Sequence, residues 1–252
     1  MNLIQAVFLG LVQGLTEWFP VSSSGHLALF QNLFGLDVPV LFDILLHVGT
    51  LIVVLLVFYK DIYKILKSIF TWNTKSEYFK LAVFIVIGSI GTVIIGYFFR
   101  NLFVGFFNNL KIVGIAFLAT GCLLFFSNKE GNKKLNCKDS FLIGLVQGIA
   151  LIPGISRSGS TISTGMLFGI ERKKVARFSF LLLIPAVIGG FIFEFKDIAS
   201  INPVYALVGV LTSVIVGFFS LRFLLKIIEK GKFRYFGYYC FLIGVITLIL
   251  GF

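Results

Sequence analysis

Two polar stretches combine an acid, hydroxyls, an imidazole and a guanidinium over short lengths of chain. Residues 13–26 read QGLTEWFPVSSSGH, and residues 153–161 read PGISRSGST. Gln13 and Glu17 are four residues apart, so on a helix they share a face and can reach the same ligand. This set of side chains suits acid–base chemistry, metal chemistry or the binding of an anion.

The serine-rich run after Pro20 is expected to begin a helix. Free backbone N–H groups and the positive end of the helix dipole favour a phosphate there. Serines at such a start are also ordinary N-caps, which is the alternative interpretation of Ser22 and Ser24. His26 lies close to an acid and suits proton transfer, although it could equally be a hydrogen-bonded core histidine.

The second stretch places Arg157 in a similar turn. Arginine binds phosphate oxygens through two parallel hydrogen bonds and keeps its charge. The alternative is an ion pair with Glu17 that only joins the two stretches. Asp43 and His47 share one face of an apolar segment and are weaker candidates, interpreted as a helix-start acid and a packed imidazole.

The composition indicates an integral membrane protein. The 252 residues are 58% hydrophobic and 13% charged, and the mean hydropathy is +1.01. That leaves too little polar surface to cover a soluble globule. The N-terminus lacks the basic segment and cleavage site of a signal peptide. The three cysteines are widely spaced, which argues against a disulfide framework or a zinc site.

Six apolar stretches are long enough to cross the hydrocarbon layer as helices. Four other apolar segments are too short, and they flank the two polar stretches in pairs. The economical interpretation is two re-entrant helix–loop–helix hairpins, since irregular backbone at membrane depth is tolerated where protein or a water-filled cavity surrounds it. The six predicted spans are residues 39–59, 79–99, 111–127, 178–195, 203–225 and 235–252.

The basic residues predict the orientation. Eighteen of the 22 Lys and Arg residues fall in the segments 60–80, 128–138, 171–177 and 222–234. Because cytoplasmic loops are enriched in Lys and Arg, both termini are expected outside, with the hairpins entering from opposite sides. The basic residues form no stripe with exposed aromatics, so the net charge of +11 does not indicate nucleic-acid binding.

The sequence contains an internal repeat. A shift of 134 residues places Gly10–Gly14 on Gly144–Gly148 and Leu33–Gly35 on Leu167–Gly169, and 11 of the 27 positions from 10 to 36 are identical. The fold class is therefore predicted as an all-α membrane protein with an inverted-topology repeat. A single domain is expected, with repeat one at about 1–127 and repeat two at about 139–252, their hairpins spanning 3–36 and 140–170.

The two halves of the repeat differ at the positions that carry chemistry. Glu17 lies opposite Leu151, Ser23 opposite Arg157, and His26 opposite a serine. An ionisable group at membrane depth costs at least ~2.5 kcal/mol and is rarely kept without a role. The repeat thus predicts one site near the bilayer midplane, with an acid, a hydroxyl and an imidazole from one hairpin and a guanidinium from the other.

These motifs resemble the undecaprenyl-diphosphate phosphatase family of bacteria, the bacitracin-resistance type. Residues 13–26 are similar to its (Glu/Gln)-x-x-x-Glu motif with the Pro-Val-Ser-Ser-x-Gly-His segment. Residues 153–161 are similar to its Pro-Gly-x-Ser-Arg-Ser-x-x-Thr motif. The resemblance covers essentially the whole chain in length, span number and repeat.

The resemblance implies hydrolysis of a C55 polyprenyl diphosphate to the monophosphate and inorganic phosphate in the bacterial inner membrane. It also implies a divalent cation, Mg²⁺ or Ca²⁺, held by Glu17 with Gln13, and a homodimer in the surrounding lipid. By motif position the catalytic residues are Glu17, Ser23, His26 and Arg157. The expected phosphate-binding residues are Gln13, Ser22, Ser24, Gly25, Ser156, Ser158, Gly159 and Thr161.

Gln13 stands where many members of that family carry glutamate. An amide can coordinate a cation but cannot act as a base, which argues against a mechanism with two ionised carboxylates. Ser23 is expected to act as nucleophile or as an orienting hydroxyl. The competing hypothesis is a secondary transporter or lipid flippase, since inverted repeats are transporter architecture. An intramembrane protease is disfavoured by the lack of a Gly-x-Ser-x-Gly elbow.

Overall fold

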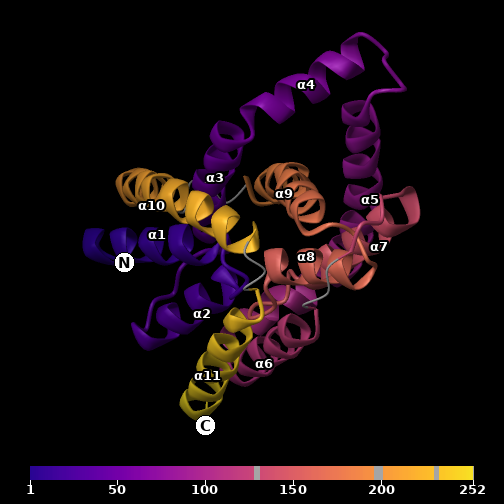
Figure 1. The fold of residues 1–252 in the computed structure, drawn as a ribbon. Coiled ribbons are helices and arrows are strands. Elements are labelled where there is room, and N and C mark those ends of the chain that lie inside the picture. Colours follow the sequence, from indigo (N-terminus) through magenta and orange to yellow (C-terminus); the bar gives the residue numbers. More distant parts are fainter. Residues whose placement is uncertain (128–130, 196–200, 230–232, 252) are drawn as a thin grey trace.

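The computed structural model describes residues 1–127, 131–195, 201–229 and 233–251, and within them it consists of helices joined by loops, without strands (Figure 1). Four helices are long and apolar enough to cross a membrane, which confirms a multi-pass membrane protein. They are α3 (Val40–Val57), α5 (Glu77–Gly105), α9 (Arg172–Glu194) and α10 (Pro203–Glu229).

Two of the six predicted spans form shorter helices. Helix α6 covers Leu110–Phe126 and α11 covers Tyr235–Leu250, with 17 and 16 residues. Both are apolar and pack against each other. That α6 and α11 each cross the membrane therefore stays a prediction, because both are shorter than the four long helices.

Two of the observed helices include charged residues that were predicted to lie in loops. Helix α9 begins at Arg172, not at 178, because its basic first turn continues the helix beyond the apolar segment. The segment 60–80, predicted only as a basic loop, contains helix α4 (Tyr59–Phe70). A short 3₁₀ helix, η1 (Phe106–Asn108), follows α5.

Each polar stretch lies between two short helices. Helices α1 (Leu3–Thr16) and α2 (Ser23–Leu33) flank the first, and α7 (Cys137–Ile149) and α8 (Arg157–Leu167) flank the second. Ser22 and Ser156 cap α2 and α8, each accepting a hydrogen bond from the backbone three residues ahead. The N-cap interpretation of Ser22 is therefore confirmed.

In each of the two helix pairs, the first helix packs against a long helix from the other half of the chain. Helix α1 packs against α10, in the second half of the chain, and α7 packs against α5, in the first half (Figure 1). Glycines allow both contacts: a Cβ on Gly10 would lie 2.4 Å from the Gly209 carbonyl oxygen, and one on Gly144 would lie 2.0 Å from that of Gly88. Small residues allow such close helix contacts within a membrane.

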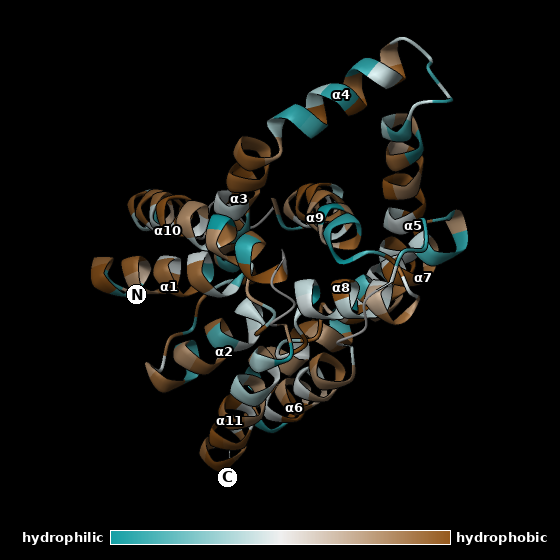
Figure 2. Cartoon of the chain, in the orientation of Figure 1, coloured by the Kyte–Doolittle hydropathy of each residue, from teal (hydrophilic) through white to brown (hydrophobic). Residues whose placement is uncertain are grey.

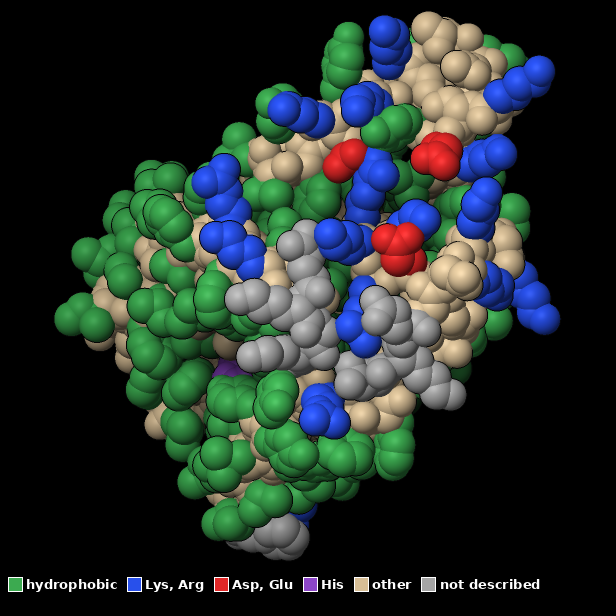
Figure 3. All heavy atoms as spheres, in the orientation of Figure 1, with side chains coloured by type: hydrophobic (Ala, Val, Ile, Leu, Met, Phe, Trp, Pro, Cys, Tyr) green, Lys and Arg blue, Asp and Glu red, His purple; other side chains and the backbone are tan. Residues whose placement is uncertain are grey.

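Basic side chains gather over one region of the molecule. Figure 3 shows Lys and Arg over α4 and near the starts of α5, α7 and α9, while hydrophobic side chains cover the region around α1, α10 and α11. Lys129, Lys196, Lys230 and Lys232, which entered the predicted charge asymmetry, lie outside the described residues.

Substituting Gly144 by alanine should destabilise the α5–α7 contact. The added methyl meets backbone atoms of α5, which cannot rotate away as a side chain can, so we expect a loss of about 1–3 kcal/mol. The thermal unfolding midpoint of the purified protein in detergent measures this. Gly105→Ala is the matched control, because a Cβ there meets no atom within 4 Å. Equal midpoints for the two variants would contradict the packing argument.

Candidate active site

The two polar stretches meet in the structure although they are more than 130 residues apart. The Ser22 hydroxyl accepts a hydrogen bond from the Gly154 N–H (3.1 Å) and donates one to the Ile155 carbonyl (3.2 Å). From the other side, the Ser158 hydroxyl donates to the Trp18 carbonyl (3.1 Å). The loops therefore hold each other in place through side chain-to-backbone hydrogen bonds.

The Glu17 carboxylate lies at the centre of this contact and is buried. Its Oε2 accepts hydrogen bonds from the Ser23 hydroxyl (2.6 Å) and from Gln13 Nε2 (3.0 Å). Its Oε1 accepts one from Arg157 Nη2 (2.5 Å). The predicted shared face of Gln13 and Glu17 is confirmed, and so is the ion pair given as the alternative role of Arg157.

Arg157 can donate further hydrogen bonds besides the one in that ion pair. It is the first residue of α8, at the position that Ser23 occupies in α2. Its side chain is 13% exposed, and its Nη1 is buried without a hydrogen-bond acceptor among the described residues. A buried guanidinium nitrogen without an acceptor costs free energy, so this geometry favours an anion at the site.

His26 points away from Glu17. Its Nδ1 lies 2.7 Å from the Ser22 carbonyl oxygen, which can only accept, so Nδ1 carries the hydrogen. Its Nε2 lies 2.8 Å from the hydroxyl of Tyr239 in α11, and the two rings stack at 5.7 Å. Both ring nitrogens are occupied, so in this conformation His26 supports the Ser22 turn and has no nitrogen left for a phosphate.

His47 is the imidazole that lies beside the carboxylate. Its Nε2 is 3.3 Å from Glu17 Oε2, and its Nδ1 is 2.7 Å from the Asp43 carbonyl oxygen. Nδ1 therefore carries a hydrogen, and a second hydrogen on Nε2 would let the ring pair with Glu17 as a cation. The sequence had suggested only a packed imidazole. The presence of two ionisable residues four positions apart within a span was the available signal.

A cavity of about 550 Å³ opens beside these groups. Glu17, Ser23, His47 and Arg157 line one end, and mostly apolar side chains of α5 and α9 line the rest. Of the predicted phosphate-binding residues, Ser22, Ser24 and Ser156 reach the cavity wall, whereas Gln13, Gly25, Ser158, Gly159 and Thr161 lie behind it.

Those residues behind the wall support the loops. Gly25 lies so close to Gly154 that a Cβ on it would come within 2.7 Å of the Gly154 Cα. Gly159 donates its N–H to the Ser156 cap. The Thr161 hydroxyl donates to the Arg157 carbonyl (2.8 Å), which ties down the first turn of α8.

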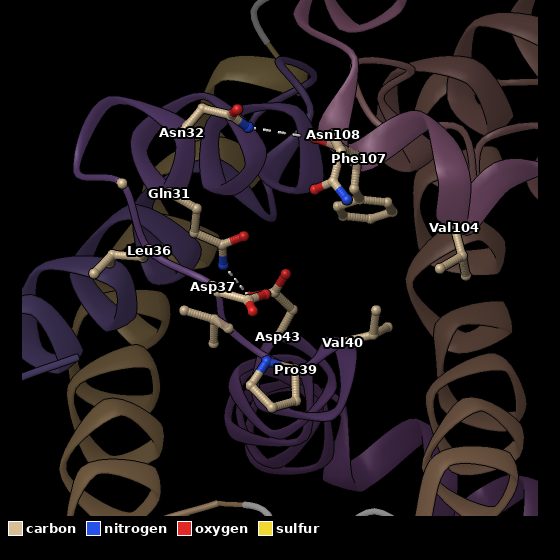
Figure 4. Close-up of a pocket in the computed structure, with 12 residues that line it drawn as sticks. Gln31, Asn32, Leu36, Asp37, Pro39, Val40, Asp43, Val104, Phe107 and Asn108 are labelled. Carbon is tan, nitrogen blue, oxygen red and sulfur yellow. Dashed lines mark hydrogen bonds between the residues drawn. The ribbon is translucent and has the colours of Figure 1, made fainter.

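A second cavity of about 500 Å³ adjoins the first, and Asp43 lines both. Figure 4 shows its polar side chains, which include Asp37 and Asp43. Asp43 accepts a hydrogen bond from Gln31 (2.7 Å). Carboxylates disfavour an anion, so this second cavity suits a phosphate less well than the surroundings of Arg157 do.

The donor set fits a divalent cation only in part. Gln13 Oε1 is buried without a partner, and with the Glu17 carboxylate it supplies two kinds of oxygen that Mg²⁺ and Ca²⁺ accept. No group of three or more His, Cys, Asp and Glu among the described residues could enclose a metal ion. Of these two residues only Glu17 lines the cavity, so a cation there would take most of its oxygen ligands from a bound phosphate group and water, as Mg²⁺ commonly does.

The fold and the site together define a multi-pass helical membrane protein with a buried cluster of ionisable side chains where two pairs of short helices meet. The family model for BacA, bacitracin resistance protein, matches residues 6–246. The chain belongs to this family, which confirms the resemblance found in the sequence.

Relatives match over nearly full length. Proteins named undecaprenyl-diphosphatase are 40% identical in Halothermothrix orenii, 42% in Desulforapulum autotrophicum and 39% in Korarchaeum cryptofilum. The alignments cover 99%, 100% and 99% of this chain, and 98%, 99% and 100% of those proteins.

Replacing Arg157 by lysine should weaken anion binding while keeping the charge beside Glu17. Lysine lacks the planar fork that reaches a carboxylate and a phosphate together, so we expect the affinity for pyrophosphate to fall about tenfold. Isothermal titration of the purified protein measures it. Arg222→Lys is the control, because that arginine lies over the Phe218 ring, outside the site. Unchanged affinity in Arg157→Lys would rule out this anion site.

Proposed function

We propose that this chain hydrolyses undecaprenyl diphosphate to undecaprenyl phosphate and inorganic phosphate. The reaction recycles the lipid carrier of peptidoglycan synthesis and gives resistance to bacitracin. Full-length relatives named for this activity support the assignment. The geometry that carries it is the buried Arg157–Glu17–Ser23 cluster, which lines a cavity with mostly apolar walls. The Arg100–Glu194 ion pair also lines this cavity, and its two charges offset each other.

Each part of the cavity suits one part of the substrate. The terminal phosphate lies at Arg157 and the N-terminus of α8, where a guanidinium and helix N–H groups neutralise it. The polyprenyl chain lies along the apolar walls of α5 and α9 and continues into lipid. Phosphoryl transfer needs chiefly positioning and neutralisation of charge, which this arrangement supplies.

The hydrogen bond between Ser23 and Glu17 favours Ser23 as the nucleophile. A hydroxyl that donates to a carboxylate directs its lone pairs elsewhere, here toward the cavity that Ser23 lines. Its oxygen bonds to the terminal phosphorus, the bond to the bridging oxygen breaks, and Glu17 takes the hydroxyl proton. The bridging oxygen leaves with undecaprenyl phosphate. Water then attacks the phosphorus of the phosphoserine, the bond to the serine oxygen breaks, and Glu17 returns its proton to that oxygen as inorganic phosphate leaves.

Arrival of the substrate makes Glu17 available for that proton. Arg157 and His47 both lie beside the carboxylate in the structure. A phosphate group competes for Arg157, which weakens the ion pair and leaves the carboxylate free to accept the proton. His47 keeps the carboxylate in place, and His26 holds the turn before Ser23.

A divalent cation forms part of this proposal. Glu17 and Gln13 Oε1 would hold it, and it would supply neutralisation of the diphosphate oxygens. Phosphate release with and without a chelator tests its participation.

We further propose the predicted membrane arrangement: six spans and two re-entrant hairpins in an inverted repeat, forming one domain in the inner membrane with both termini outside. The matching caps of α2 and α8 support the repeat, as do the exchanged contacts of α1 and α7. The cavity mouth near η1 and the start of α3 then faces outward.

The competing transporter hypothesis rests on the repeat alone. The names of the relatives favour the enzyme. An assay in detergent separates the two hypotheses, because transport requires a closed membrane and hydrolysis does not.

Purified protein in detergent should release phosphate from undecaprenyl diphosphate, and Glu17→Gln should lower the rate at least about 10²-fold by removing the base.

Ser23→Ala should abolish the acid-stable phosphoenzyme that single-turnover labelling traps in the unchanged protein. Glu171→Gln is the control, since this glutamate is exposed and pairs with Lys174. Turnover without any phosphoenzyme would contradict the serine route.

The natural Cys137 tests the orientation without an engineered label. It is exposed at the start of α7, inside the predicted cytoplasmic segment. Cys240 is buried, and Cys122, which is also exposed, lies within the apolar helix α6. A membrane-impermeant maleimide should label Cys137 in inverted vesicles and leave it unlabelled in intact cells. The Cys137→Ser variant identifies the labelled site. Labelling in intact cells would reverse the proposed orientation.

A further inference from the structure

Helix α4 uses only part of its surface to contact the rest of the protein. Ile65 and Ser68 are buried against it. Asp61, near the start of the helix, pairs with Arg177 of α9. This ion pair and the buried face fix the rotation of α4 about its axis, so its other two faces point outward.

One outward face is apolar. Tyr59, Tyr63, Leu66 and Phe70 recur at intervals of three and four residues and are all exposed, Phe70 by 85%. Trp72 follows directly and is 75% exposed. A soluble protein rarely leaves such an apolar face uncovered, so the surroundings of α4 include an apolar partner.

The other outward face is basic. Lys60, Lys64 and Lys67 lie beside the apolar face at helical spacing. Asp61 is the one acidic residue within Tyr59–Phe70, and Arg177 already neutralises it. Lys64 donates to the Tyr78 hydroxyl of α5, whereas Lys60 and Lys67 pair with no acidic side chain among the described residues, so their charge is available to a partner outside the chain. Figure 2 shows the two kinds of surface on α4, which extends away from the other helices.

The position of α4 identifies that partner. It connects α3 and α5, two of the helices able to span a membrane, so it lies where both leave the bilayer. Its apolar face continues their lipid-facing surface, which includes Leu56 at the end of α3. A helix with an apolar face bordered by lysines matches the boundary between acyl chains and anionic headgroups.

We propose that α4 lies in the interface of the membrane and binds anionic lipid headgroups through Lys60 and Lys67. Its aromatic and aliphatic face enters the upper acyl-chain region. Because α3 and α5 both line the cavity, this contact anchors the connection between two walls of the site.

The two tryptophans of the chain allow a direct test, because Trp72 is exposed and Trp18 is fully buried. The full-length protein is reconstituted in vesicles of zwitterionic lipid that contain brominated phosphatidylglycerol or brominated phosphatidylcholine. Bromine quenches nearby indoles, and subtracting the signal of Trp72→Phe isolates Trp72. We expect the anionic brominated lipid to quench Trp72 at lower mole fraction than the zwitterionic one.

The lysines are then tested by Lys60→Gln and Lys67→Gln, which spare Lys64 because it also donates to Tyr78. Each change should reduce the preference for the anionic lipid about fivefold. Lys138→Gln is the control, since this exposed lysine lies on α7.

Three results would overturn the proposal. In the first, neither brominated lipid quenches Trp72. In the second, the anionic and the zwitterionic lipid quench it equally. In the third, Trp72 is quenched only when the protein is diluted in lipid. The last would show that a second copy of the chain covers α4.

Discussion

The ion pair between Glu17 and Arg157 is the interaction on which the site depends. Both side chains are largely buried, and each belongs to a different half of the chain. A lone buried charge is far more costly than a well-bonded pair, so neither loop can hold its charge without the other. The Ser22–Gly154 and Ser158–Trp18 hydrogen bonds keep the loops at the distance that this pairing requires. The same guanidinium retains a free nitrogen, so a structural bond is also a place for a ligand.

Much of this arrangement was predictable because it depends on local patterns. Residue type and four-residue spacing placed Gln13 beside Glu17, and the serines at 22 and 156 are N-caps. The repeat indicated that the two polar stretches converge. Composition and apolar length indicated a multi-pass helical protein.

Side-chain direction was not predictable, because distant helices determine it. His26 lies near Glu17 in sequence, yet its ring turns toward Tyr239, 213 residues later. His47 reaches the carboxylate because α3 packs against the first helix pair, a tertiary contact that no local pattern encodes. Helix α4 was not predicted, because the lysines of this segment indicate a cytoplasmic loop. The helical spacing of its apolar residues was the local pattern that favours a helix.

The separation of Glu17 and Arg157 along the chain has a consequence for biosynthesis. A ribosome that adds ~5–20 residues per second needs roughly 7–30 s to pass from one to the other. During that interval the nascent protein already contains the acid and lacks its guanidinium partner. His47 lies only 30 positions downstream of Glu17, so it is synthesised long before Arg157. The growing polypeptide therefore contains both members of the Glu17–His47 contact well before the ion pair between its two halves can form.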